Sequence, residues 1–282
     1  MNKILFCTDG SHYSEVSLEY ACWLANHCRK DIDCLYVSSS EQFELSMIPL
    51  TRTGIASESY QAFFSQYQEM EALKSESIKN RVGELLREKG FQGKWEFIHK
   101  TGHIVDVIQS IEHDAEYVVL GKRGENANLA AGHLGGTMEK LIRITKKPCL
   151  LTASKFIEPK KILISYDGSF TCAKAVEHLV SHPFFKDLEM HIVTVLDDSV
   201  VRDKANVLIH QAVAVAHDAG VQPIHKILDG KIEDVVPSYA QKEGISLLVL
   251  GAHGHSRIRD FFVGSHSMDL IRACHIPVLL YR

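Results

Sequence analysis

Two glycine-rich segments have the residue types and the spacing that could bind a phosphate. In the second half of the chain an apolar run ends at Gly251, and the pattern G-x2-G-x9-G-S continues through Gly254, Gly264 and Ser265. Glycines let the backbone turn tightly and approach a ligand without a Cβ in the way. The unpaired N–H groups at a helix N-terminus and the positive end of the helix dipole favour a phosphate. We therefore expect a phosphate-binding loop here, with His253 beside the phosphate.

The matching segment of the first half departs from that spacing. Ten residues, rather than nine, separate Gly124 from Gly135. Gly136 stands where the second half has Ser265, although Thr137 supplies a hydroxyl one position later. Lys122 and Arg123 could neutralise phosphate charge. Binding in the first half is left open, with the candidate ligands Gly121, Arg123, Gly124, Gly135, Gly136 and Thr137.

Both segments belong to a repeat that spans the whole chain. Residues 3–11, KILFCTDGS, return as residues 161–169, KILISYDGS. Because the matching segments recur in the same order, we expect two copies of one domain, residues 1–153 and 160–282, with a linker at 154–160.

The first copy carries an insertion after its second expected strand. Asp9 matches Asp167 at an offset of 158, whereas Gly102 matches Gly230 at an offset of 128, so about 30 residues are added within the segment 39–89. The insertion is predicted to be a loop followed by a long amphipathic helix. It is either a longer connecting helix or a lid or partner-docking element. Its apolar residues near helical spacing are Phe63, Phe64, Tyr67, Met70, Ile78, Val82 and Leu85.

Each half alternates short apolar runs with helical patterns. This alternation predicts βαβ units and a Rossmann-like α/β domain, a parallel sheet with helices on both faces. Pro237 is expected to kink or shorten the helix at 232–241. Strands are expected at 3–8, 33–38, 94–99, 116–121 and 148–152, and at 161–166, 190–195, 222–228, 246–251 and 276–281. Helices are expected at 14–28, 104–113 and 138–145, and at 171–180, 232–241 and 267–274.

Ligands of open parallel sheets bind beyond the carboxyl ends of the strands, where the strand order reverses. Asp167, Val195 and Gly251 fall at such ends in the second half. Asp9 and Asp167 each precede Gly-Ser, so they could also cap the helix that follows. Capping and ligand contact are compatible.

The glycine pattern, together with Asp-Gly-Ser after the first strand of each copy, resembles the universal stress protein family over the whole chain, as two tandem domains. The resemblance implies a five-stranded sheet of order 3-2-1-4-5 in each domain, with the last strands pairing between domains as an intramolecular pseudo-dimer. It also implies that the glycine motif holds the ribose and phosphates of ATP, that the Asp lies beside the nucleoside, and that main-chain atoms of the second strand meet adenine. Carried over by position, the ATP-binding residues are Asp167, Val195, Gly251, Gly254, Gly264 and Ser265, with Asp9 and Val37 joining the loop residues of the first domain.

Composition argues against several other functions. A net charge of −4 provides no basic field for nucleic acid or an anionic membrane. No apolar run approaches the roughly 20 residues of a membrane span. Seven cysteines without CxxC spacing, and no signal-peptide pattern, predict a cytoplasmic protein with reduced thiols. The sixteen histidines form no recognisable zinc set, so no metal site is expected beyond a Mg²⁺ that arrives with the nucleotide.

Three functions remain in view. The leading one is an ATP-binding stress-response module that acts through an unknown protein partner. The second is an interaction protein with vestigial nucleotide sites. The third is a slow ATPase or self-phosphorylating protein acting on Ser265 or Ser267, although the sequence has no Walker motif and no catalytic residue can be named. ATP, ADP and AMP are not distinguished, nor is a monomer from a homodimer.

Overall fold

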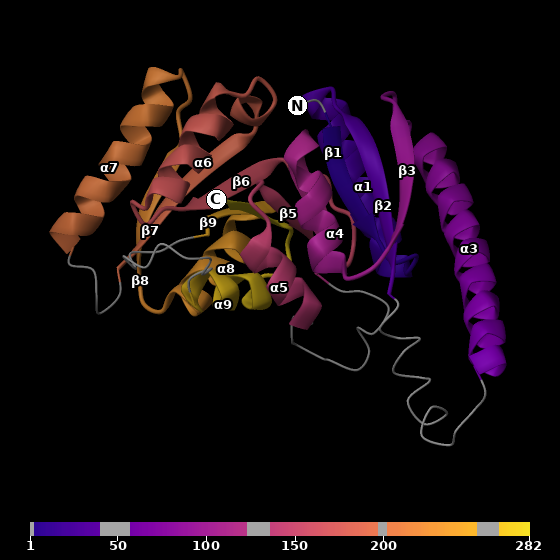
Figure 1. The fold of residues 1–282 in the computed structure, drawn as a ribbon. Coiled ribbons are helices and arrows are strands. Elements are labelled where there is room, and N and C mark those ends of the chain that lie inside the picture. Colours follow the sequence, from indigo (N-terminus) through magenta and orange to yellow (C-terminus); the bar gives the residue numbers. More distant parts are fainter. Residues whose placement is uncertain (1–2, 40–56, 123–135, 197–201, 253–264) are drawn as a thin grey trace.

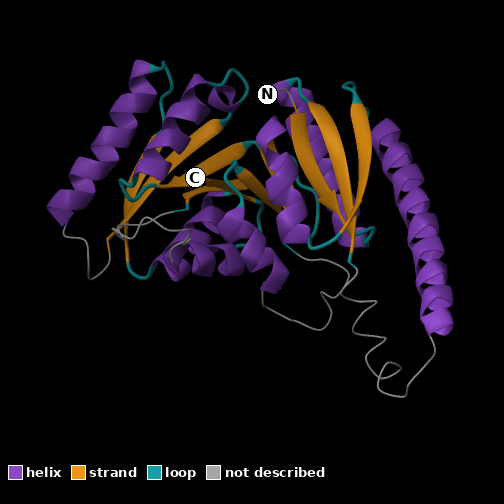
Figure 2. Cartoon of the chain, in the orientation of Figure 1, coloured by secondary structure: helices purple, strands orange, loops and turns teal. Residues whose placement is uncertain are grey.

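Ten strands form one continuous sheet in the computed structural model (Figure 2). The described residues are 3–39, 57–122, 136–196, 202–252 and 265–282. The strand order across the sheet is β3-β2-β1-β4-β5-β10-β9-β6-β7-β8. The order of each half is therefore 3-2-1-4-5, which confirms the expected topology.

The first half places its helices between successive strands (Figure 1). The near-continuous apolar runs of β1 and β4 are explained by helices on both faces of the sheet. The elements are β1 (Lys3–Thr8), α1 (His12–Cys28), β2 (Asp31–Ser38), α3 (Ser57–Glu88), β3 (Trp95–Thr101), α4 (Ile104–Ile111), η1 (Glu112–Asp114), β4 (Ala115–Gly121), α5 (Gly136–Ile144) and β5 (Cys149–Thr152).

The second half repeats this plan with shorter connections. Its helix α7 stands where the first half has the much longer α3. The elements are β6 (Lys161–Ser165), α6 (Phe170–Ser181), η3 (Phe185–Asp187), β7 (Glu189–Leu196), α7 (Arg202–Asp218), β8 (Ile224–Asp229), α8 (Ile232–Glu243), β9 (Leu247–Gly251), α9 (Ser265–Ala273) and β10 (Val278–Tyr281).

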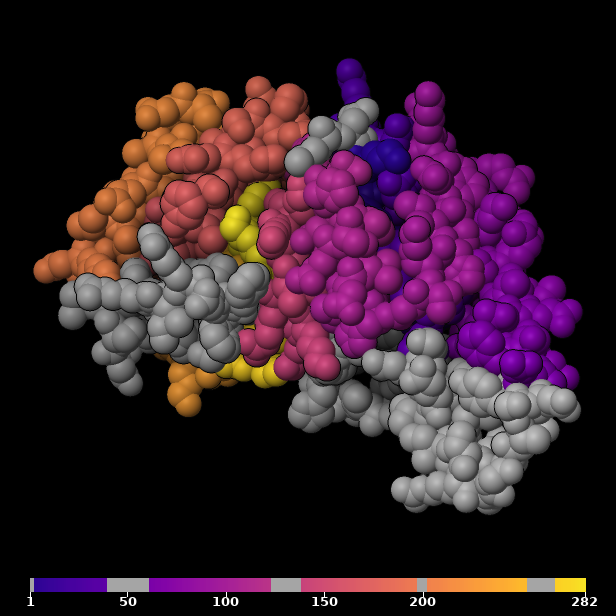
Figure 3. Space-filling model, viewed as in Figure 1, coloured from indigo at the N-terminus to yellow at the C-terminus, as the bar shows by residue number. Residues whose placement is uncertain are grey.

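The two half-sheets join through their last strands. β10 pairs antiparallel with β5, with Leu279 opposite Leu150, whereas the pairs inside each half are parallel. In the space-filling view the yellow C-terminal residues lie between the two halves (Figure 3). The expected pairing of last strands, and with it the intramolecular pseudo-dimer, is confirmed.

Two apolar layers cover the sheet, one on each face. One layer contains buried residues of α1, α3, α6 and α7, and the other contains buried residues of α4, α5, α8 and α9. Each layer runs through both halves, so the cores of the two halves are continuous. This packing fixes the carboxyl edge of one half relative to the other.

Most expected elements are present, and two details differ. Pro237 does not shorten its helix, because α8 continues to Glu243 and ends at Gly244, which adopts the left-handed conformation with φ 68°. The long helix α3 buries its apolar residues in its C-terminal part, at Ile78, Val82 and Leu85. Toward its N-terminus the expected apolar face lies in solvent, since Met70 is 57% exposed.

None of the described helices is both long and apolar enough to cross a membrane.

Candidate functional site

The carboxyl edge of each half-sheet has a step beside its first strand. β2 pairs with β1 only as far as Tyr36, but its pairing with β3 continues through Val37. In the same way, β7 pairs with β6 as far as Val193, while its pairing with β8 continues through Val195. Val37 and Val195, the residues expected to meet adenine, thus lie where the first strand no longer pairs with the second. Because β1 and β6 are the strands where the order reverses, each step lies at a topological switch point.

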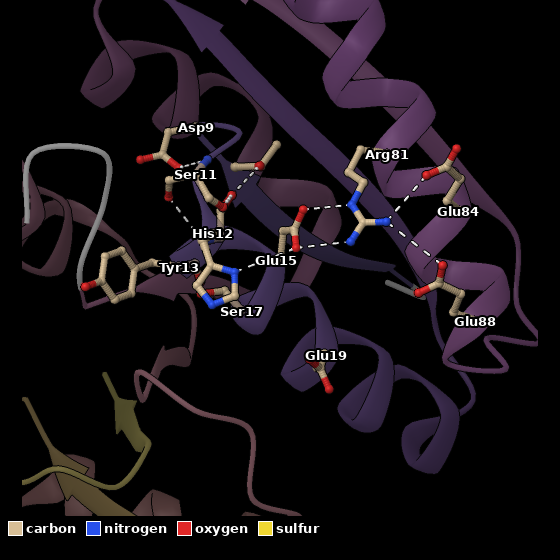
Figure 4. Close-up of polar contacts among 12 residues, drawn as sticks. Asp9, Ser11, His12, Tyr13, Glu15, Ser17, Glu19, Arg81, Glu84 and Glu88 are labelled. Atoms are coloured by element: carbon tan, nitrogen blue, oxygen red, sulfur yellow. Dashed lines mark hydrogen bonds and ion pairs between the residues drawn. The ribbon is translucent and has the colours of Figure 1, made fainter.

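The Asp-Gly-Ser turns that follow β1 and β6 have the same geometry. Oδ1 of Asp9 accepts a hydrogen bond from the amide of Ser11 at 2.9 Å, and Oδ1 of Asp167 accepts one from the amide of Ser169 at 2.8 Å (Figure 4). The serines, rather than the aspartates, cap the helices: Ser11 Oγ accepts from the amide of Ser14, and Ser169 Oγ accepts from Cys172. The alternative in which the aspartates cap these helices is therefore wrong, and each aspartate instead holds the turn that presents the capping serine.

The glycine of each turn lies under an apolar side chain from the neighbouring helix. Gly10 and Gly168 have φ of 78° and 76°, a conformation that favours glycine. A Cβ on Gly10 would lie 2.8 Å from Cδ1 of Ile78, and a Cβ on Gly168 would overlap Cδ2 of Leu208. Sequence reasoning missed this contact, although aligning α3 with α7 would have paired Ile78 with Leu208.

Gly251, at the end of β9, has a packing role as well as a place at the candidate site. A Cβ there would lie 2.6 Å from Thr171 Oγ1 and 2.9 Å from the amide nitrogen of Cys172. Only glycine lets the first turn of α6 approach the strand end so closely. Packing against α6 therefore requires glycine at position 251 whether or not a ligand binds.

The N-terminus of α9 is held next to the end of β9. The hydroxyl of Ser267 donates to the carbonyl oxygen of Gly251 at 3.0 Å. Beyond the strand end, the amide of Ala252 donates to the carbonyl of Tyr281 at 2.7 Å. The first turn of α9, which begins at Ser265, therefore lies at the carboxyl edge of the sheet with the orientation that favours an anion. In the first half α5 begins at Gly136, followed by Thr137.

Lys122 does not lie at a phosphate site in this structure. Its Nζ donates to the carbonyl oxygens of Cys274 and Ile276, at 2.8 and 2.9 Å, in the other half of the chain. Burial lowers the pKa of the Lys122 ammonium to about 8. The suggestion that Lys122 neutralises phosphate in the first loop is therefore replaced by a contact between the halves.

The remaining candidates of the two glycine loops lie outside the described residues. These are Arg123, Gly124 and Gly135 in the first half, and His253, Gly254 and Gly264 in the second.

A separate small pocket lies between α1 and α3, beneath Gly10. Its lining is apolar at the base, with Phe6 and Leu18, and it is bordered by Glu15 and Arg81. Arg81 Nε donates to Glu15 Oε1 at 2.8 Å and ties α3 to α1 (Figure 4). Arg81 holds the pKa of Glu15 below its usual range. This pocket is on the α1 and α3 face, and its described lining includes no residue of β2.

Within the part of the chain that the structure describes, no group of three or more His, Cys, Asp or Glu side chains is arranged to hold a metal ion. His178 and His182, four residues apart on α6, stack with ring centroids 5.7 Å apart. His178 also contacts Tyr117 of the first half. This histidine pair is thus placed at the junction between the halves.

Known proteins resemble this chain over its full length. The model of the universal stress protein family matches residues 1–153 and 158–282. Universal stress protein Slr1230 of Synechocystis is 34% identical over 291 aligned residues that cover 100% of both chains. A universal stress protein of Archaeoglobus fulgidus has a crystal structure that covers 99% of this chain and 95% of its own, with a TM-score of 0.68 and 21% identity. Protein PA1789 of Pseudomonas aeruginosa, described as functionally unknown, covers 99% of this chain and 92% of its own, with a TM-score of 0.65 and 15% identity.

Proposed function

The chain belongs to the universal stress protein family, and on that premise we propose that it binds an adenine nucleotide, ATP, at the carboxyl edge of its second half. In this proposal the protein is a binding module of the stress response, and ATP binding alters its contacts with a protein partner. Hydrolysis, where it occurs, is slow and incidental. We also propose the domain limits 1–153 and 160–282.

The observation that carries the proposal is the placement of α9. Ser267 holds the first turn of this helix against the carbonyl of Gly251, so the helix N-terminus faces the end of a central strand. The intervening segment has the spacing G-x2-G-x9-G-S. Main-chain N–H groups there would hold the phosphates, and the step at Val195 would receive the base. Asp167 is at the same edge, with one oxygen in its own turn.

ATP would bring its own Mg²⁺, because Mg²⁺ is commonly held through the phosphates with only one or two protein carboxylates. Asp167, two residues after the end of β6, is the carboxylate that we propose for this role. The protein's contribution is positioning, through backbone donors and the helix dipole, rather than a charged clamp.

The first half is the weaker candidate, and one observation favours a different role for it. Lys122, the second residue of its glycine segment, donates instead to the carbonyls of Cys274 and Ile276, just after α9 of the other half. We propose that the first half mainly supports the second-half site and presents α3 for protein contact, because Phe63, Met70 and Leu73 of that helix are exposed.

Isothermal titration with ATP tests both statements. Wild type is expected to bind with a stoichiometry near one, and Gly254→Val, which adds a branched side chain in the glycine loop, is expected to lose binding by at least tenfold. Gly124→Val, the matched change in the first half, is expected to bind as wild type does. Circular dichroism and thermal melts of all three proteins separate lost binding from lost folding. Equal binding by wild type and Gly254→Val would overturn the proposal, and a stoichiometry of two would overturn the weaker role of the first half.

A further inference from the structure

Helix α9 is held near both ends, at one end by a group of its own half and at the other by a group of the first half. At its N-terminus Ser267 donates to Gly251, the last residue of β9 in the second half. Just beyond its C-terminus Lys122, which follows directly after β4 of the first half, donates to the carbonyls of Cys274 and Ile276. The helix itself has nine residues, Ser265–Ala273, so it is about 13 Å long.

The Lys122 contact is suited to fix this helix end. Cys274 directly follows α9, and its amide donates to the carbonyl of Leu270 in the last turn. A cation on the carbonyl of Cys274 therefore lies next to the negative end of the helix dipole, where it is stabilising. The ammonium group reaches the two carbonyls from the other half of the chain, across the junction of β5 and β10. Removing this group would leave the two carbonyls without their donor in a partly buried place.

A second cation makes the reciprocal contact. Arg282, the residue after β10, donates to the carbonyls of Ile142 and Arg143 at the C-terminal end of α5, with 2.6 Å to Arg143. Arg272 of α9 pairs with Glu139 of α5, so the two helices also contact each other directly. Each half thus supplies a cation to carbonyls at or just beyond the C-terminal end of the helix that opens the other half's candidate site.

We propose that Lys122 is a positioning residue that couples the end of β4 in the first half to the candidate nucleotide site of the second half through α9. A change in the first half that moves Lys122 changes the position of α9, and with it the amides that face a ligand in the second half. The inference rests on the proposed function, because it concerns regulation of the same second-half site. By linkage, the coupling acts in both directions.

The test compares three lysine variants in the full chain. Lys122→Met removes the cation and keeps a long side chain, Lys122→Arg keeps the cation, and Lys242→Met, on the exposed end of α8, is the matched control. Lys122→Met is expected to weaken ATP binding about fivefold, within the usual range of coupling energies. It is also expected to speed amide hydrogen exchange in residues 265–273 by about tenfold. Lys122→Arg and Lys242→Met are expected to stay within twofold of wild type in both measurements.

The outcomes separate this inference from the proposed function. If wild type binds no ATP, the proposed function fails and the proposed coupling fails with it. If wild type binds ATP and Lys122→Met binds it equally well, the inference alone is overturned. It is also overturned if Lys122→Arg is as weak as Lys122→Met, because the effect would then reflect packing rather than the cation.

Discussion

The hydroxyl of Tyr117 and Nε2 of His178 lie 2.5 Å apart, in a hydrogen bond that joins β4 of the first half to α6 of the second. His178 stacks on His182, and its ring centroid lies 5.6 Å from that of Tyr281. The contact therefore belongs to a buried cluster at the junction of the halves. Burial, followed by the charge of His182, lowers the pKa of His178, and burial lowers the pKa of His182.

These two histidines are expected to destabilise the protein in mild acid. Since their pKa values are lower in the folded chain than in the unfolded one, the unfolded chain binds more protons as the pH falls through 6.5, and the free energy of unfolding decreases. Urea titrations at pH 7.5 and 5.5 should show a smaller decrease for His178→Gln than for wild type. Tyr117→Phe, which removes the hydroxyl, should cost about 1 kcal/mol at pH 7.5 and keep the acid-dependent loss. The same pH dependence in wild type and His178→Gln would contradict this account.

Lys122 is expected to change stability in the same direction, with the free energy of unfolding rising as the pH rises, but in the alkaline range. Burial lowers its pKa from 10.5 to about 8, so between these values the unfolded chain holds a proton that the folded chain has lost. The stability of wild type relative to Lys122→Met should therefore rise by about 2 kcal/mol from pH 7 to 9.5. Denaturant titrations of both proteins measure this difference, and contributions of the cysteines, which are shared, cancel. A difference that does not change with pH would show that Lys122 keeps its ordinary pKa.

Gly168 is expected to tolerate alanine much less well than Gly220 does. Both have positive φ, 76° and 80°, but a Cβ would overlap Leu208 at Gly168 and would meet nothing within 4 Å at Gly220. Gly220→Ala should cost about 1 kcal/mol from backbone strain alone. Gly168→Ala should cost roughly 2 to 4 kcal/mol, since overpacking adds to the strain. Thermal melts and urea titrations give both values, and equal losses would mean that Leu208 does not restrict the turn.

The thiols are expected to be unreactive while the chain is folded. Burial raises the pKa of Cys22, Cys28, Cys149 and Cys172 to about 12 and that of Cys274 to about 11. Since the thiolate is the nucleophile, a disulfide reagent at pH 8 should label less than one thiol per chain rapidly. In guanidinium chloride it should label all seven. Rapid labelling of several thiols in the native protein would show that the core opens readily.

Much of the fold can be predicted from the sequence because the chain repeats itself. β9, Leu247–Gly251, is a run of buried residues, as expected for a strand with helices on both faces of its sheet. The matching run in the first half supports the same strand assignment. The step beside Val195 also follows from strand order. These features depend on local pattern and on topology, which the repeat makes visible twice.

Contacts between the halves could not be predicted in this way. Lys122 follows a glycine in a loop motif, so its sequence context suggested a phosphate, whereas its partners are carbonyls more than 150 positions away. The sequence could not identify the cap, because Asp9 and Ser11 are both good helix caps and only geometry shows that Ser11 is the cap. The exposed part of α3 has the same periodicity as the buried part, so pattern alone could not separate them.

A crystal structure of the chain grown with millimolar ATP and Mg²⁺ tests nucleotide binding at the second half most directly. We predict density for phosphates within hydrogen-bond distance of the first-turn amides of α9, with the base beside Val195 in the second half. An empty edge there, or one filled by the protein's own side chains at saturating ATP, would contradict this prediction.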